Sequence, residues 1–269
     1  MSNEMLDILR PDFGPDAPVT VQAAFSLRTG GVSEGCYAAL NLGAHVGDAA
    51  QNVAQNRRRL RAALSLPGEP LWLSQVHGTS VLNADVPVCD SAPEPPSGTH
   101  TDAPPVADAV VTRQREVVCA IMIADCLPVL FAARDGSVVG AAHAGWRGLV
   151  AGVLESAVRA LGNEPSQLLA WLGPCIGAAN FEVGDEVRAA FLTASQNSHC
   201  VDRTTQAFAR NARGRWQCDL QALARMRLEA AGVSAIHGLS CCTFQDASRF
   251  FSHRRDGVSG RMAALIWRT

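Results

Sequence analysis

Residues 117–162, VVCAIMIADCLPVLFAARDGSVVGAAHAGWRGLVAGVLESAVRALG, combine the patterns of a buried sheet and of an amphipathic helix. Short apolar runs typical of buried strands occur at 117–123, 127–133 and 138–142. Apolar residues then recur at helical spacing over 148–161, and Gly162 is a favourable helix terminator. Because strands lead directly into a helix and no internal repeat is present, we expect one compact, layered α/β domain with a mixed β-sheet and flanking helices.

Similar patterns on either side of this stretch predict the remaining elements. Strands are expected at 19–27, 71–74, 79–82, 108–112, 167–172, 236–242 and 262–267. Helices are expected at 49–66, 184–194 and 220–231. Asp48, with Gln51 three residues later, is the expected N-cap of the first helix, and Asp219 is the expected N-cap of the last.

Proline and glycine divide the chain. Residues 1–18 contain three prolines and are predicted to form a loose lead-in, and the glycine-rich segment 28–47 a structured loop. A single catalytic domain is therefore expected over 19–269. It carries a proline-rich insertion at 84–105, either a surface excursion or a lid.

Composition excludes several classes of protein. The 269 residues have a formal net charge of −2, so neither nucleic acid nor an anionic membrane is an expected partner. The longest apolar runs are too short to span a bilayer. All 23 basic residues are arginine, which excludes a Schiff-base lysine and the lysine of a Walker A loop. The expected partner is a small-molecule substrate, and nothing in the sequence indicates an oligomeric state.

The cysteines point to a reducing compartment. Nine cysteines occur without a Cys-x-x-Cys pair, and the first thirty residues contain no apolar stretch typical of a secretory signal. We therefore expect a cytoplasmic protein with reduced thiols. Any special cysteine is then expected to be catalytic or metal-bound rather than part of a disulfide.

Three segments place polar residues at the ends of expected strands. They are Ser74–Gly78, Ala124–Pro128 and Ala141–Gly148, and they contain His77, Cys126 and His143. Two imidazoles and a thiolate are good zinc ligands, and three protein ligands leave a fourth position for water or substrate. The spacing of the three residues is not a metal signature, so packed or surface roles remain open at this point.

Arginine is the only side chain that can supply a fixed cation for phosphate here. Arg147 lies at the predicted start of the helix over 148–161, where backbone N–H groups also favour an anion. A surface ion pair is the alternative for this residue. Arg28, beside the glycine-rich loop, is the next candidate. Asp125 is either a site residue or a turn residue.

Several motifs together resemble the YfiH-like family. They are Thr29–Ser33, Leu40–Asp48, Gln75–Gly78, Ala124–Pro128, His143–Gly148, Leu172–Ile176 and Phe250–Gly257, collinear from about residue 20 to the C-terminus. The resemblance implies a compact, layered α/β fold related to cysteine hydrolases, with His77, Cys126 and His143 as metal-binding and catalytic residues. From the same motifs we expect Asn41 and Asp125, beside Arg147 and Arg28, to contact substrate. His253 stands where family members often have tyrosine, and the segment 84–105 is longer than the family needs.

Members of this family have been labelled polyphenol oxidase, laccase-domain protein, purine nucleoside phosphorylase and peptidoglycan editing factor. The resemblance therefore implies zinc-dependent phosphorolysis of adenosine, inosine, guanosine or methylthioadenosine, with adenosine deamination as a related activity. The His-x-Glu and Cys-x-x-Cys signature of zinc deaminases is absent, so deamination would need a different arrangement.

Three alternatives stay open. In a metal-free cysteine amidohydrolase, Cys126 would be the nucleophile and His143 or His77 the base, with a peptidoglycan precursor as substrate. Copper is the second alternative, because two histidines and a cysteine also form blue-copper centres. Four-electron phenol oxidation needs a further copper cluster, and only seven histidines occur, without a His-x-His pair. We therefore favour zinc over copper. A non-enzymatic binding module is the third alternative.

Overall fold

The computed structural model describes residues 6–85, 103–195 and 197–269. The predicted insertion 84–105 lies mostly outside the described residues, which resume at Ala103. Among the helices described, none has the length and apolarity to cross a bilayer.

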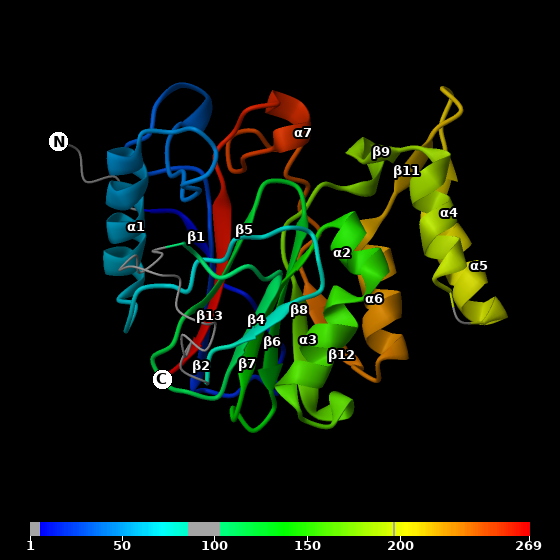
Figure 1. Ribbon diagram of the computed structural model, residues 1–269, viewed down its shortest axis with the longest axis horizontal. Helices are drawn as coiled ribbons and strands as arrows, with labels where there is room; N and C mark the ends of the chain where they lie inside the picture. Colours follow the sequence, from blue (N-terminus) through cyan, green and yellow to red (C-terminus); the bar gives the residue numbers. More distant parts are fainter. Residues whose placement is uncertain (1–5, 86–102, 196) are drawn as a thin grey trace, which may run out of the picture.

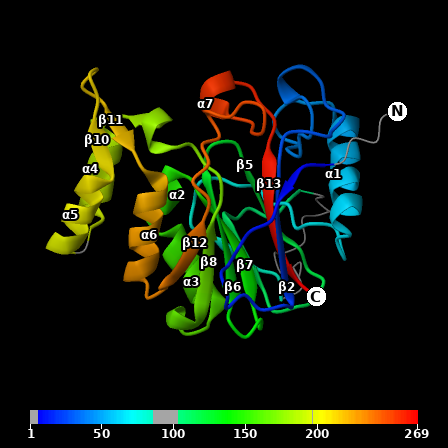
Figure 2. The same ribbon diagram turned by 180° about the vertical axis from the view of Figure 1, so that it is seen from behind.

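Two β-sheets face one another at the centre of the molecule (Figures 1 and 2). The larger, six-stranded sheet has the order β12 (Ala235–Gly238), β8 (Leu168–Leu172), β6 (Leu127–Ala133), β7 (Val139–Ala144), β4 (Ala109–Thr112), β3 (Val81–Asn83). The pairs β12–β8 and β3–β4 are parallel and the others antiparallel, which confirms the predicted mixed sheet. The second sheet is antiparallel, in the order β1 (Ile8–Leu9), β2 (Val21–Ser26), β13 (Met262–Arg268), β5 (Cys119–Ile123).

Helices cover the outer face of each sheet and make a four-layered molecule. Helix α1 (Ala50–Leu64) packs on the four-stranded sheet, and α2 (Trp146–Ala151), α3 (Val153–Leu161) and α6 (Leu220–Ala230) pack on the six-stranded sheet (Figure 1). Beyond them lie α4 (Asp185–Thr193), α5 (Ser198–Gln206) and the small sheet of β10 (Phe208–Arg210), β11 (Trp216–Cys218) and β9 (Glu182–Val183). The remaining helices are α7 (His253–Asp256) and three short 3-10 turns, Gly35–Tyr37, Pro165–Gln167 and Ala178–Asn180.

Strands that are buried on both faces explain the apolar runs. In β5, Ile121 packs into the core between the two sheets, and its neighbour Met122 packs into the core beneath α1. Successive side chains of a strand point to opposite faces, so a strand with a core on each side needs apolar residues at every position.

Several details differ from the sequence-based prediction. The helix expected over 148–161 begins at Trp146 and is divided at Gly152, which has a φ of 101° and separates α2 from α3. Asp48 does not cap α1, whose N-cap is Ala49, because its carboxylate accepts hydrogen bonds from Ser33 and Asn41. The Asp219 cap is confirmed: its side chain accepts from the Ala222 N–H.

Other differences concern short elements. Part of the lead-in predicted over 1–18 is ordered, because β1 pairs with β2 and Phe13 is buried. Of the two strands expected near 71–82, the first is reduced to isolated bridges and the second becomes β3. Helix α5 and the β10–β11 hairpin are absent from the prediction, because their segments are too polar to show a clear apolar period.

The glycine-rich loop is joined to α1 through one buried side chain. Asn56 accepts from the Val32 N–H and donates to Ser33 Oγ and to the carbonyls of Ala39 and Asn41. We expect Asn56→Ala to lower the free energy of unfolding by about 2–4 kcal/mol, because the Val32 N–H and the Asn41 carbonyl lose their partner in the interior. Urea denaturation measures the loss. Gln55→Ala, on the exposed side of α1, should change stability by less than about 0.5 kcal/mol, and equal losses in both variants would contradict the assignment.

Candidate functional site

His77, Cys126 and His143 converge at one end of the two sheets. His77 lies in the loop after the Leu71–Ser74 segment, Cys126 directly precedes β6, and His143 is in β7. The antiparallel register pairs Pro128 with His143, so the start of β6 lies beside the end of β7. Each residue offers one ligand atom, and these atoms lie within 4.8 Å of one another. Sequence reasoning grouped these three residues, and the structure brings them together.

A buried carboxylate, that of Asp108, orients this group. Its Oδ1 accepts from His143 Nδ1 at 2.8 Å and from the His77 N–H at 2.9 Å. Its Oδ2 accepts from the N–H groups of Gly78 at 2.7 Å and Val76 at 3.1 Å. The side chain is fully buried. One carboxylate therefore sets the imidazole ring of His143 and the loop that carries His77, whose φ is 62°.

Asp108 is missing from the residues predicted from the sequence. The available signal was an ionisable side chain directly before the apolar run 109–111 of the strand expected at 108–112. A buried carboxylate needs hydrogen-bond partners, and this one has them in the two segments that carry the histidines.

The Gly145–Gly148 turn leaves room for the site. A Cβ on Gly145 would lie 2.7 Å from His77 Cδ2 and 2.9 Å from Cys126 Sγ. A Cβ on Gly148 would lie 2.9 Å from the Gly78 carbonyl oxygen. Glycine is therefore required at both positions, and the space between imidazole and thiol stays open at Gly145.

The charges of the group are coupled. Burial raises the pKa of the Cys126 thiol, but His143 and His77 outweigh burial and bring this pKa to about 6. Burial lowers the pKa of His143, but Cys126 and Asp108 outweigh it and raise this pKa to about 9. At pH 7 and without metal, a thiolate therefore lies beside an imidazolium. A metal must displace the His143 proton, so metal affinity should increase with pH.

The donor set fits a zinc ion. Zinc bonds of about 2.3 Å to sulfur and about 2.0–2.1 Å to nitrogen place neighbouring tetrahedral ligands roughly 3.3–3.7 Å apart. Cys126 Sγ and His77 Nε2 are 3.6 Å apart. His143 Nδ1 is engaged by Asp108, which leaves Nε2 for a metal, and a carboxylate behind a histidine ligand is common at zinc sites.

Two chambers adjoin this group and share the lining residues His77, Ala124, Cys126 and His253. The first, which we call the aromatic chamber, has a volume of about 180 Å³; its further lining residues are Asp125, Trp146, Arg147, Ile176, Phe181, Leu220 and Arg254. The second, the polar chamber, has a volume of about 230 Å³; its further lining residues are His45, Gln75, Met122, Ile123, His143 and Arg261. Both chambers therefore give access to the same His–Cys–His group.

The residues predicted to bind substrate lie in different places. Arg147 is exposed and lines the aromatic chamber, with its guanidinium over the Trp146 ring at 4.4 Å. Arg28 donates to the carbonyls of Ala38 and Ala247, and it lines neither chamber. Asn41 is fully buried behind the polar chamber rather than in its wall. Contact of these residues with substrate stays a prediction.

Asp125 is engaged in a clamp. Its Oδ1 accepts from Thr243 Oγ1 at 2.6 Å, and its Oδ2 accepts from Ser252 Oγ at 3.0 Å and from the Arg254 N–H at 2.7 Å. Its φ of 96° directs the chain sharply into Cys126. The carboxylate thus ties the segment that carries His253 to the site.

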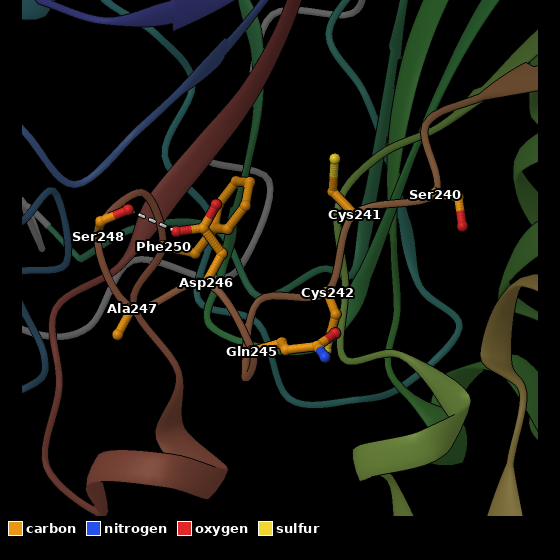
Figure 3. Close-up of a pocket in the computed structure, with 8 residues that line it drawn as sticks. All are labelled: Ser240, Cys241, Cys242, Gln245, Asp246, Ala247, Ser248 and Phe250. Carbon is orange, nitrogen blue, oxygen red and sulfur yellow. Dashed lines mark hydrogen bonds between the residues drawn. The ribbon is translucent and has the colours of Figure 1, made fainter.

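A separate hollow of about 500 Å³ lies beside Cys241 and Cys242 (Figure 3). The two thiols point away from each other in Figure 3, and Cys242 Sγ accepts from the Gly177 N–H at 3.1 Å. Asp246 accepts from Ser248 Oγ at 2.6 Å. The eight residues that line this hollow include no histidine, so they form no counterpart of the His–Cys–His group.

Comparisons with known proteins find similar sequences along almost the whole chain. Residues 22–269 match the family model described as multi-copper polyphenol oxidoreductase laccase. A protein named purine nucleoside phosphorylase from Pseudomonas aeruginosa is 48% identical over 260 residues, 96% of this chain and 97% of that protein. The purine nucleoside phosphorylase YfiH of Escherichia coli is 46% identical over 250 residues, 93% of this chain and 95% of that protein.

Solved structures share the fold. Neisseria meningitidis protein NMB0706 superposes with a TM-score of 0.85 at 42% identity, covering 97% of this chain and 98% of that chain. YlmD from Geobacillus stearothermophilus superposes with a TM-score of 0.82 at 33% identity, covering 95% of this chain and 94% of that chain. The predicted resemblance is confirmed, and the chain belongs to the multi-copper polyphenol oxidoreductase laccase family that includes the YfiH proteins.

Proposed function

We propose that this protein is a zinc-dependent purine nucleoside phosphorylase whose metal ligands are His77, Cys126 and His143. The observation that carries the proposal is the three-ligand group, oriented by Asp108, at the junction of an aromatic and a polar chamber. The names of relatives at 46–48% identity over almost the whole chain support the choice of substrate.

The aromatic chamber suits a purine base. Trp146 and Phe181 place aromatic rings in its lining, and Ile176 and Leu220 add apolar side chains. Aromatic stacking binds any purine, so adenosine, inosine, guanosine and methylthioadenosine are all candidate substrates. Arg254 lies over the Phe181 ring at 5.2 Å, which fixes that ring at the chamber wall.

The reaction joins a phosphate oxygen to the anomeric carbon while the bond from that carbon to the base nitrogen breaks. The leaving base must take up a proton, and His253 lies where the two chambers meet, within reach of both. Zinc bound by the three ligands would act as a Lewis acid on an oxygen of the reactants.

The first test is the metal content. Protein purified without added metal should contain about one zinc per chain by elemental analysis, and Cys126→Ser should lose it because a thiolate ligand is removed. Cys36→Ser is the matched control, since Cys36 is exposed and outside both chambers. Equal, near-zero zinc in the wild type and in Cys126→Ser would contradict the proposal.

That negative result would favour a metal-free cysteine amidohydrolase, which one observation supports. The pKa of the Cys126 thiol is about 6, and a His143–Asp108 pair lies beside it, an arrangement found in cysteine nucleophiles. A muropeptide precursor would then be the substrate to assay.

The role of Asp108 gives a second test. Asp108→Asn should weaken zinc binding about 10- to 100-fold, because the amide no longer favours the Nδ1-protonated form of His143. Competition with a chromogenic chelator measures the affinity. Asp135→Asn, in an exposed turn, is the control and should bind zinc like the wild type. Wild-type affinity in a folded Asp108→Asn variant would remove Asp108 from the site.

The activity itself gives a third test. Zinc-loaded protein should convert inosine to hypoxanthine only when phosphate is present, and Cys126→Ser should abolish this conversion. Product analysis by chromatography would identify ribose 1-phosphate. Ammonia release from adenosine in the same samples tests the related deaminase activity. Hypoxanthine release that is independent of phosphate would contradict phosphorolysis, and oxygen uptake with copper and a phenol would favour oxidation.

A further inference from the structure

Arg261 is a half-buried cation in the wall of the polar chamber. Its Nη1 donates to the carbonyls of Ser259 at 2.8 Å and Gly260 at 3.1 Å, and to Ser259 Oγ at 3.3 Å. Within residues 6–85, 103–195 and 197–269, no carboxylate lies within ion-pair distance of Arg261, and Nε and Nη2 have no hydrogen-bond partner. One edge of the guanidinium is therefore fixed by the protein, and the remaining donors are available in the chamber.

The Asn41–Gly43 segment holds Arg261 in place. Asn41 Oδ1 accepts a hydrogen bond from the backbone N–H of Arg261 at 2.8 Å, and the backbone N–H of Leu42 donates to the Arg261 carbonyl. A Cβ on Gly43 would lie 2.8 Å from Arg261 Cγ, so the side chain packs directly on this glycine. Asn41 is thus placed to position Arg261.

The same loop brings a second polar group to the chamber. His45 lines its wall, and burial together with Arg261 and Arg57 lowers the pKa of His45. Both guanidinium groups favour the neutral imidazole, which can donate a hydrogen bond from one ring nitrogen. Gln75 also lines this chamber. Its side-chain amide is held in place because it accepts a hydrogen bond from the Met122 N–H and donates one to the Met122 carbonyl, both at 2.8 Å.

Arg147 fits an anion less well. It is exposed, its guanidinium lies over the Trp146 ring, and its helix α2 has only six residues. A guanidinium that the protein already holds in place loses less freedom on binding an anion than an exposed one.

We propose that the polar chamber is the subsite for the attacking phosphate, bound by the free edge of Arg261 with His45 as a second donor. This inference rests on the proposed phosphorylase function, and it assigns Asn41 as a positioning residue for Arg261. Guanidinium groups bind phosphate oxygens in a bidentate manner, which the ammonium group of a lysine cannot do. This chain contains no lysine, so arginine is its only strongly basic side chain.

The test compares Arg261→Gln with Arg147→Gln in the zinc-loaded protein. Arg261→Gln should raise the KM for phosphate about tenfold or more, with the KM for inosine changed less than about twofold. Arg147→Gln should show the reverse: a raised KM for inosine and an unchanged KM for phosphate. Arg58→Gln, an exposed position on α1, is the matched control and should change neither. Asn41→Ala should raise the KM for phosphate alone.

Isothermal titration with inorganic phosphate gives a readout that does not depend on turnover. The wild type should bind phosphate, and Arg261→Gln should weaken binding by the same factor as the KM. Arg261→Lys, which keeps the charge but loses the planar fork, is measured in case Arg261→Gln fails to fold, and it too should bind more weakly. Melting temperature is the folding control for each variant.

The outcomes separate this inference from the proposed function. Phosphate binding that needs Arg261, in a protein that cleaves no nucleoside, would support the subsite and contradict the phosphorylase activity. Unchanged phosphate binding and KM in folded Arg261→Gln or Arg261→Lys would overturn the subsite, and so would a loss of phosphate affinity in Arg147→Gln.

Discussion

The site depends on the buried carboxylate of Asp108, which accepts four hydrogen bonds. Three come from consecutive backbone N–H groups at Val76, His77 and Gly78, and the fourth comes from the His143 ring. A carboxylate in the interior is stable only when its oxygens are satisfied, so the loop and the ring are held to one geometry. Removing it would free both histidines at once.

The two sheets supply the rest of the frame. The pairing of β6 with β7 sets Cys126 beside the turn that follows His143, and Gly145 keeps that turn out of the space between ligands. Both strands are fully buried, so their positions are fixed by packing on each face. The ligands therefore stand on rigid strand ends, although two of the three lie outside the strands themselves.

The fold was predictable where a pattern was local. The runs at 117–123 and 127–133 are apolar at every position, and they became strands buried on both faces. The break at Gly152 was not predictable, since glycine within a helical pattern is compatible with a continuous helix. The sequence around Asp48 is typical of a helix N-cap, but its carboxylate accepts a hydrogen bond from the Asn41 side chain. Asp108 was missed because its partners are some thirty residues away in the chain, beyond any local pattern.

In the loops that surround the site, guanidinium groups donate hydrogen bonds to backbone carbonyls that lie outside helices and strands. Arg28 joins the carbonyls of Ala38 and Ala247, and Arg57 donates twice to the Leu42 carbonyl. Arg255, in α7, donates to three carbonyls of the preceding loop: Thr243, Phe244 and Phe250. A planar fork satisfies several backbone acceptors with one side chain, which a single ammonium does with less definite geometry. Because 23 arginines look alike in the sequence, only the structure separates those that hold a loop from Arg261, whose free edge faces a chamber.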